Sequence, residues 1–251
     1  MQRYFISPEQ MSEREATLRG DDAHHLMRVM RAAPGDNVVV SNGVDRECVA
    51  EVIELQKDAV RLSLVEERPM AGEPRAAVWI AQSLPKGDKL ETVIQKGTEI
   101  GATAFLPFLS ARTIVQYDAK KEAKRLERWR KIAKEAAEQA HRSKVPDVRE
   151  PMQWKQLMAL VREASFALFC YEKEHARTLK EALRQAKEAA NGGPVLVIVG
   201  PEGGFTAEEA AEAEASGATP IGLGPRILRT ETAGLVAASC ILYELGEMGG
   251  E

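Results

Sequence analysis

Two short segments late in the chain combine glycines, prolines and charged side chains in a way that suits the binding of a small ligand. Residues 199–206 (VGPEGGFT) follow an apolar run, and residues 223–233 (LGPRILRTETA) lie between a short apolar stretch and a helical pattern. In open α/β sheets, ligands bind beyond the carboxyl ends of the strands. Glycine lets the backbone approach a flat ligand closely, and a helix N-terminus offers free N–H donors. The two segments therefore predict a pocket formed by two loops.

Each segment also has a purely structural interpretation. The first could be a plain tight turn, and in the second Thr230 or Thr232 could cap the last helix. A GxGxxG fingerprint and a GK[ST] loop are both absent from the sequence, which disfavours an ordinary nucleotide-binding enzyme. The second segment carries two arginines, a glutamate and two threonines, which is more polar chemistry than a connector needs. We therefore favour a ligand-binding role.

The part of the chain that positions these loops, residues 73–251, alternates strand and helix patterns, which is typical of an α/β domain with a parallel sheet. The run at residues 194–199 is fully apolar, as buried parallel strands are, and Thr206 with Glu209 predicts a capping box at the start of the next helix. Strands are expected at residues 76–81, 104–109, 166–170, 194–199 and 219–223, and helices at 88–100, 119–142, 177–190, 206–216 and 233–248.

Residues 1–72 have a different pattern. Residues 47–53 and 59–65 alternate polar and apolar side chains, and the first of these follows an apolar run that ends in an Asn42-Gly43 turn. This is a hairpin signature, and with one expected helix at residues 21–31 it predicts a small β-barrel. The polar segment 66–74 contains proline and glycine and is expected to link the two domains.

Composition excludes several classes of protein. The 251 residues carry a net charge of −4, yet ten basic and four acidic side chains fall within residues 120–144. This basic segment is either a solvated helix face or a patch for RNA phosphates.

The three cysteines are odd in number and widely spaced, which favours a cytoplasmic location, and the four histidines show no metal-ligand spacing. No secretory signal, membrane span or metal site is expected.

Here the sequence resembles a known family. The two loops, read as GPEGGF at residues 200–205 and LGPRILRTET at 223–232, are similar to those of the ribosomal small subunit methyltransferase E family, which methylates N3 of a uracil in 16S ribosomal RNA. In the segment 25–31 of the matching set, Met30 replaces the leucine expected in the family, which is a conservative change. Further matching pieces follow in the same order along the chain: residues 25–31 (HLMRVMR), 86–91 (KGDKLE), 94–101 (IQKGTEIG) and 135–139 (EAAEQ).

The resemblance implies a fold that periodicity alone does not supply. It implies a PUA-like β-barrel at residues 1–72 that binds RNA, followed at residues 73–251 by a SPOUT methyltransferase domain with a C-terminal trefoil knot. It further implies a homodimer with its active site at the subunit interface, S-adenosyl-L-methionine as the cofactor and the small ribosomal subunit as the partner.

The resemblance also implies which residues hold the cofactor. The two loops supply most of them, and a third loop after the strand at 166–170 closes the pocket. The expected cofactor-binding residues are Phe169, Cys170, Gly200, Pro201, Glu202, Gly203, Gly204, Leu223, Gly224, Ile227, Leu228, Arg229 and Thr230.

Methylation of uracil N3 requires loss of a proton from a weak acid, so a base or a cation should assist. By residue type, Glu231 could accept the proton and Arg229 could stabilise charge on a uracil oxygen, although Glu135 or Glu138 could also serve and Glu231 could instead be structural. Arginine suits phosphate and base recognition. The expected RNA contacts are Arg3, Arg28 and Arg31 in the barrel and Arg125, Arg128 and Arg142 in the basic segment.

Two other functions remain open at this point. One is an enzyme of the same fold that acts on a different RNA, such as a tRNA ribose or guanine. The other is a non-catalytic RNA-binding or ribosome-assembly protein that has kept the fold.

Overall fold

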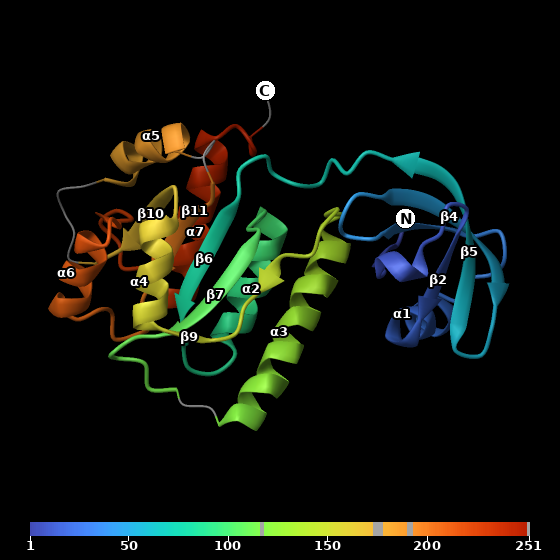
Figure 1. Cartoon of the computed structure of the whole chain (residues 1–251), viewed down its shortest axis with the longest axis horizontal. Coiled ribbons are helices and arrows are strands. Elements are labelled where there is room, and N and C mark those ends of the chain that lie inside the picture. The colour runs from blue at the N-terminus through green and yellow to red at the C-terminus, as the bar shows by residue number, and fades with distance from the viewer. Residues whose placement is uncertain (116–117, 173–177, 190–192, 250–251) are drawn as a thin grey trace. The chain divides into compact units, whose positions relative to one another are not determined.

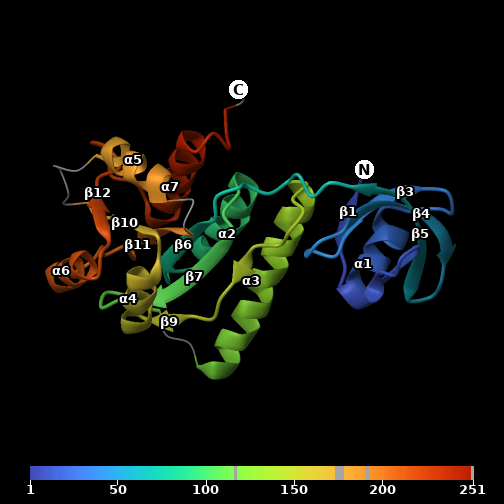
Figure 2. The ribbon, with the colours of Figure 1, turned by 45° about the horizontal axis from the view of Figure 1, so that its top comes forward.

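The computed structural model describes residues 1–115, 118–172, 178–189 and 193–249. The chain divides into two compact units, and Figures 1 and 2 show their elements. Unit 1 contains Met1–Glu73 together with Ala137–Val145, and unit 2 contains Pro74–Ala136 and Pro146–Glu251. The sequence division at residue 72 therefore stays a proposal, since contacts also assign a short later segment to unit 1. Among the described helices, none has the length and apolar character needed to cross a membrane.

Unit 1 is built on a five-stranded sheet with the order β1-β3-β4-β5-β2. The strands are β1 (Arg3–Phe5), β2 (Glu15–Arg19), β3 (Asn37–Ser41), β4 (Glu47–Leu55) and β5 (Ala59–Arg68), with a 3-10 turn at Pro8–Gln10. β1 pairs with β3 in parallel and the other neighbours are antiparallel. The predicted strands that flank Asn42-Gly43 are confirmed, and Asn42 Oδ1 accepts three backbone N–H groups in the turn.

The helix expected at residues 21–31 is shorter and irregular. It begins as α1 (Gly20–His24) and continues as one π-helical turn, η2 (His25–Val29). Arg31, two residues after its end, has a positive φ of 55°. Ala23 and Leu26 face the core of unit 1 with Tyr4 and Leu18. The turn leaves Arg28 and Arg31 exposed.

Unit 2 contains a parallel sheet with the order β12-β10-β11-β6-β7-β8, and β9 pairs with β7. The strands are β6 (Val78–Ser83), β7 (Ala104–Leu109), β8 (Asp147–Val148), β9 (Met152–Gln153), β10 (Phe166–Cys170), β11 (Val195–Val199) and β12 (Thr219–Ile221). The helices are α2 (Lys89–Ile100), α3 (Ala119–Gln139), α4 (Trp154–Glu163), α5 (Leu179–Ala189), α6 (Ala207–Ala215) and α7 (Thr230–Glu244). The predicted α/β class with a parallel sheet is confirmed.

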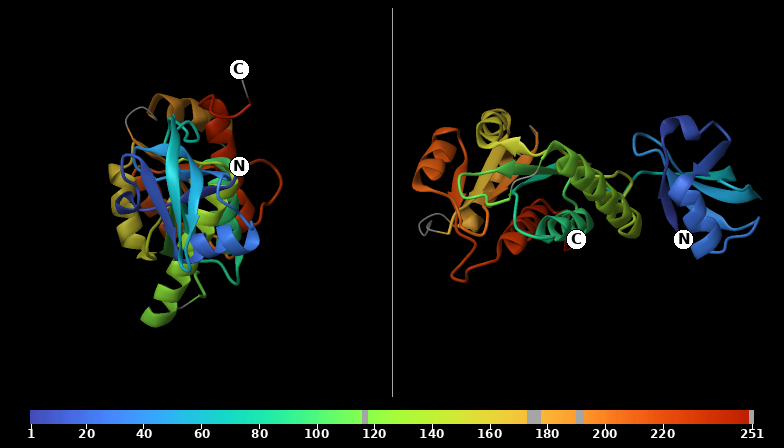
Figure 3. Two further views of the ribbon diagram at one scale, coloured as in Figure 1. Left: turned by 90° about the vertical axis from the view of Figure 1, so that its right-hand side faces the viewer. Right: turned by 90° about the horizontal axis from the view of Figure 1, so that it is seen from below.

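The sheet of unit 2 is covered on both faces, which is why β11 is apolar at every position. Leu196 and Ile198 pack with α4 and α6 on one face, whereas Val199 faces Gly234 of α7 on the other. Figure 3 shows α4 and α6 on one side of the sheet and α7 on the other, with α2 beside α7. A Cβ on Gly234 would lie 3.3 Å from Val199 and 3.2 Å from Ile80, so glycine lets α7 approach the strands closely.

Two boundaries that bear on function differ from the sequence prediction. α7 begins at Thr230 and not at residue 233, so the second loop ends at Arg229 and neither threonine is its N-cap. β6 lies two residues later than predicted, at Val78–Ser83, which places Gln82 and Ser83 at its carboxyl end. The predicted capping box at α6 is confirmed, because Thr206 Oγ1 accepts Glu209 N–H at 3.1 Å and Glu209 Oε2 accepts Thr206 N–H at 2.9 Å.

Candidate active site

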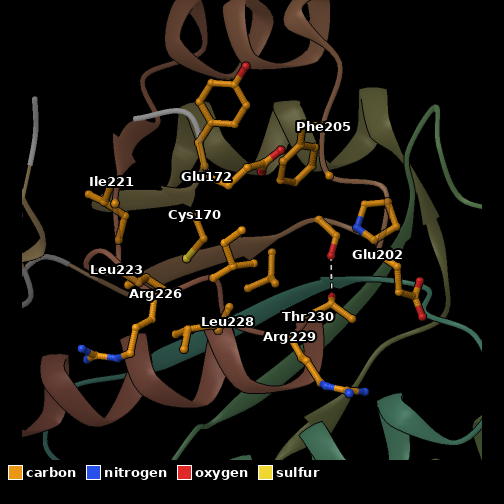
Figure 4. Close-up of a pocket in the computed structure, with 18 of the residues that line it drawn as sticks. Cys170, Glu172, Glu202, Phe205, Ile221, Leu223, Arg226, Leu228, Arg229 and Thr230 are labelled. Carbon is orange, nitrogen blue, oxygen red and sulfur yellow. Dashed lines mark hydrogen bonds between the residues drawn. The ribbon is translucent and has the colours of Figure 1, made fainter. Parts of the chain in front are cut away.

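A cavity of about 660 Å³ opens at the carboxyl ends of β10, β11 and β12. Both sequence-predicted loops form its walls, and the first turn of α7 closes one side (Figure 4). The structure thus brings the two loops together around open space, as the sequence predicted. The cavity is lined by Lys89, Cys170, Tyr171, Glu172, Val199, Gly200, Pro201, Glu202, Gly203, Gly204, Phe205, Ile221, Gly222, Leu223, Gly224, Pro225, Arg226, Ile227, Leu228, Arg229, Thr230 and Ala233.

Phe169 is the one predicted cofactor residue that does not line this cavity. Its side chain is fully buried on the α4 and α6 side of the sheet, with its ring centroid 4.3 Å from that of Phe205. Because side chains alternate along a strand, Cys170 faces the cavity where Phe169 faces the core. We therefore correct the prediction for Phe169, which supports Phe205 from behind.

The first loop approaches its surroundings too closely for most side chains. A Cβ on Gly200 would lie 2.9 to 3.2 Å from three atoms of the buried Phe205 ring, and Gly204 has a positive φ of 64°. Phe205 cannot withdraw, because the rings of Phe108 and Phe169 pack against it. The backbone of this loop is therefore exposed to the cavity without side chains in front of it.

A buried hydrogen-bond network joins the first loop to the start of α7. Thr230 Oγ1 donates to the Gly200 carbonyl at 2.6 Å, the bond drawn in Figure 4. Gln82, which is 1% exposed, donates through Nε2 to Thr230 Oγ1 at 2.8 Å and to the Gly200 carbonyl at 3.4 Å. Three elements, β6, β11 and α7, are thus held at a fixed spacing, and that spacing sets the width of the cavity.

Replacing Thr230 with valine is expected to lower the free energy of unfolding by about 1–3 kcal/mol, because it leaves the Gly200 carbonyl and Gln82 Nε2 with fewer partners in a buried place. The cavity should also bind ligand more weakly. Urea unfolding and calorimetric titration measure the two effects. Thr232→Val is the matched control, since no hydrogen bond of its side chain is recorded in the described structure. Equal losses in both variants would contradict the network's role.

Charged groups gather where the first loop meets α2. Glu202 Oε1 accepts a hydrogen bond from Lys89 Nζ at 2.7 Å and one from the Lys86 backbone N–H at 3.1 Å. Partial burial alone would raise the pKa of Glu202, but the hydrogen bonds from Lys89 and from backbone N–H groups outweigh it and hold the pKa below its usual value. Glu202 is therefore a carboxylate at neutral pH.

Glu231, the predicted base, lies beside this group and not in the cavity wall itself. Its Oε2 atom is 3.9 Å from Lys89 Nζ, and the side chain is 19% exposed. That oxygen is buried and has no hydrogen-bond partner among the described residues. Arg229 does line the cavity, and Figure 4 shows its guanidinium and that of Arg226 pointing apart on either side of Leu228.

The loop after β7 closes the same end of the sheet. Glu209, a buried carboxylate at the start of α6, accepts the Ala111 backbone N–H at 2.8 Å. Arg112 Nη1 donates to the Gly203 carbonyl at 2.6 Å. The first cavity loop is therefore held by the loop after β7 as well as by its hydrogen bonds to β6 and α7.

Cys170 is a poor nucleophile in this setting. Burial raises the pKa of its thiol to about 12, so the thiolate is scarce at neutral pH. The three cysteines are all free. Among the described residues, no cluster of histidine, cysteine and acidic side chains could hold a metal ion, and His175 lies outside those residues. Covalent chemistry on Cys170 therefore has no support.

The predicted RNA-binding arginines separate into two groups. Arg3 and Arg142 are buried: Arg3 holds Glu47 through both terminal nitrogens, and Arg142 holds Glu73 with one contact of 2.6 Å. These two guanidinium groups are held inside unit 1, so we correct their assignment to a structural role. The prediction missed this because their carboxylate partners are distant in the sequence.

The other predicted arginines are accessible. Arg28 and Arg31 are exposed, Arg128 is 61% exposed and Arg125 is partly buried. Arg125 and Arg128 both bind Glu91, at 2.9 and 2.6 Å, so part of their charge joins α3 to α2. Sequence reasoning missed Gln82, Tyr171, Glu172 and Lys89 as parts of the site. Of these four, Gln82 alone gave no signal, because Tyr171 and Glu172 begin the third loop that the resemblance implies and Lys89 lies in the matching segment 86–91.

Comparisons with known proteins agree with this architecture. A model of the RNA methyltransferase domain matches residues 72–242, and a model of the RNA methyltransferase PUA domain matches residues 18–65. The ribosomal RNA small subunit methyltransferase E of Bacillus subtilis is 40% identical over the whole of both chains. Its counterpart in Synechocystis is 36% identical over 95% of this chain and 76% of its own.

A solved structure shares the same fold throughout. The ribosomal RNA small subunit methyltransferase E of Neisseria gonorrhoeae, bound to S-adenosyl methionine, is 30% identical and superposes with a TM-score of 0.86 over 97% of each chain. From the matching domain models and the full-length relatives, the chain belongs to the ribosomal RNA small subunit methyltransferase E family.

Proposed function

We propose that the chain transfers a methyl group from S-adenosyl-L-methionine to N3 of a specific uracil in 16S ribosomal RNA of the small subunit. The observation that carries the proposal is the convergence of the two glycine-containing loops on one cavity of about 660 Å³. Family membership supplies the substrate class, since the curated relatives are named as methyltransferases of small-subunit ribosomal RNA.

The cavity fits this cofactor. Its walls combine apolar side chains such as Ile221 and Leu228 with bare backbone at Gly200 and Gly204, where a Cβ would meet neighbouring atoms within 3 Å. The residues that would hold the cofactor are those of the two loops, together with Cys170 at the end of β10, where the third loop begins. When bound, the cofactor supplies an electrophilic methyl group on a positively charged sulfur.

The protein's own task is to present the base and to manage one proton. Glu231 is our proposed proton acceptor, and Arg229 our proposed stabiliser of charge on a uracil oxygen. Among the alternatives, Glu138 accepts the Phe5 backbone N–H at 3.3 Å within unit 1, and Glu135 is exposed on α3. None of the three carboxylates lines the cavity, but Glu231 directly follows Arg229 and Thr230, which do, so Glu231 is the better candidate.

RNA is proposed to bind through Arg28 and Arg31 of unit 1 and through the basic face of α3. That face includes Arg125 and Arg128 and also the exposed Lys120 and Lys124 near its start. Positive side chains that neutralise phosphates release counterions, so the affinity of such a surface depends steeply on salt. The net charge of −4 is compatible with this surface because basic side chains outnumber acidic ones by ten to four within residues 120–144.

Reversing the charge of Lys120 and Lys124 together is expected to weaken RNA binding and to reduce its salt dependence by about one unit of slope per lost phosphate contact. These lysines are better targets than Arg125 and Arg128, whose reversal would also repel Glu91. Filter binding at several salt concentrations measures the effect. Lys180→Glu with Lys187→Glu on α5 is the control, and an unchanged salt slope in the α3 variant would remove α3 from the RNA surface.

We further propose a homodimer, the knotted topology and a cytoplasmic location. α7 supports the dimer: its residues 233–242 are apolar apart from Ser239, as in buried helices, yet Val236 and Cys240 are only partly buried and Tyr243 is 68% exposed. Ile227, in the adjoining loop, is 94% exposed. A second copy of the chain would cover this surface, and equilibrium sedimentation would test it.

The proposed function is tested by titrating the protein with S-adenosyl-L-methionine and then adding unmodified small subunits with the labelled cofactor. We expect saturable cofactor binding and about one methyl group per subunit, as for an enzyme that modifies one base flipped into its pocket. Binding of RNA without any methyl transfer would favour the non-catalytic alternative. Transfer to tRNA in place of small subunits would favour an enzyme of the same fold with another substrate.

A further inference from the structure

Lys89 is a charged residue of the cavity wall to which the proposed function has so far given no task. It begins α2, just beyond the carboxyl end of β6, and its side chain is 31% exposed. It lines the cavity together with Glu202, which binds its ammonium group at 2.7 Å. The low pKa of Glu202 keeps that partner charged, so the ammonium is held at the cavity wall.

The surroundings of Lys89 leave hydrogen-bonding capacity unused on both sides. An ammonium group has three donors, and among the described residues it donates one hydrogen bond, to Glu202. Glu231 Oε2 is paired with the Lys89 ammonium only at 3.9 Å, too far for a hydrogen bond, and it is buried without a hydrogen-bond partner among the described residues. Buried polar atoms without hydrogen-bond partners are uncommon and costly in native proteins. Such an atom therefore suggests that a bound ligand supplies the missing hydrogen bond.

A donor and an acceptor side by side match one edge of the proposed base. In uracil, the N3–H donor lies between two carbonyl oxygens, and loss of the proton spreads negative charge onto those oxygens. A fixed cation beside one of them stabilises the charge as it develops. Lys89 can donate to a carbonyl while Glu231 accepts from N3, which is the complementary pattern.

We propose that Lys89 is a further catalytic residue, whose ammonium group binds a carbonyl oxygen of the target base while Glu231 takes the N3 proton. In this step the N3–H bond breaks, its electron pair stays on the base, and a new O–H bond forms on Glu231. Glu202 is a positioning residue that holds Lys89 at the cavity wall. This inference rests on the proposed function, because it requires a base with an ionisable N–H between two carbonyls.

The test replaces Lys89 with methionine, which keeps the length of the side chain and removes its charge. Single-turnover methyl transfer to small subunits should fall by about 10²–10³-fold, the usual effect of removing one stabilising donor. Because the base then ionises less readily, the rate should continue to rise at pH values where the wild-type rate has levelled. Lys89→Arg should recover part of the rate. Because Lys89 lines the cavity, any loss of cofactor affinity in calorimetry should be much smaller than the loss of rate, and RNA affinity without cofactor should change by no more than about twofold.

The matched control is Lys96→Met on the same helix, since Lys96 is 48% exposed and bound to Glu99. Thermal melting of each variant separates loss of fold from loss of chemistry. Lys89→Met with a wild-type rate and pH profile would overturn the proposal, and so would a loss of cofactor affinity that accounts for the whole loss of rate. If the wild-type protein binds cofactor and RNA but transfers no methyl group, the proposed function itself fails, whatever Lys89 does.

Discussion

Replacing Glu231 with glutamine is expected to slow single-turnover methyl transfer by about 10²–10⁴-fold at neutral pH, the contribution usual for a general base. Glutamine keeps the shape of the side chain but cannot take a proton from N3. Cofactor affinity should be unchanged, because Glu231 does not line the cavity. Rapid-quench kinetics with labelled cofactor and unmodified small subunits measure the rate.

The control for this change is Glu244→Gln at the far end of α7, which removes a charge from the same helix without touching the site. A structural role for Glu231 makes a different prediction. In that case the glutamine variant would lose stability together with activity, and raising the pH would not restore the rate. Full activity in the variant would exclude Glu231 as the base.

Replacing Gly200 with alanine is expected to weaken cofactor binding by about 10-fold to 100-fold, because overpacking a well-packed place costs about 1–3 kcal/mol. The new Cβ would lie 2.9 Å from the ring of Phe205, and Phe169 and Phe108 pack against that ring and keep it in place. The loop must therefore move toward the cavity or break its bond to Thr230. Isothermal titration with S-adenosyl-L-methionine measures the loss.

A second substitution makes the cause of that loss visible. Phe205→Leu removes the ring atoms that the new Cβ would meet, so the double variant should bind the cofactor better than Gly200→Ala alone. Non-additivity of this kind is expected only for groups in contact. If Gly200→Ala binds as tightly as the wild type, the loop does not approach the cofactor in the way we describe.

The sequence predicted the parts of this protein whose signals are local. β11 is apolar over its whole length, the α6 capping box needs only Thr206 and Glu209, and the turn at Asn42-Gly43 defines a hairpin. Each of these rests on residues close together in the chain. The twelve predicted cofactor residues that line the cavity came from the resemblance, which carried information about the fold that periodicity lacks.

What the sequence did not predict depends on contacts between distant residues. Arg3 and Arg142 looked available for RNA because Glu47 and Glu73, which bury them, lie 44 and 69 residues away. The start of α7 at Thr230 is set by its bonds to Gly200 and Gln82, and no local capping pattern marks it. Lys89 belongs to the site because α2 begins beside the first loop, and this contact between distant parts of the chain leaves no local sequence pattern.

The central claim is that the two loops form a cofactor site whose methyl group reaches N3 of one uracil. The most direct test is to incubate the protein with labelled S-adenosyl-L-methionine and small subunits lacking the modification, digest the RNA and map the labelled nucleoside by mass spectrometry. We predict a single 3-methyluridine in 16S ribosomal RNA. Label on a ribose, on another base or on no nucleoside at all would contradict the account.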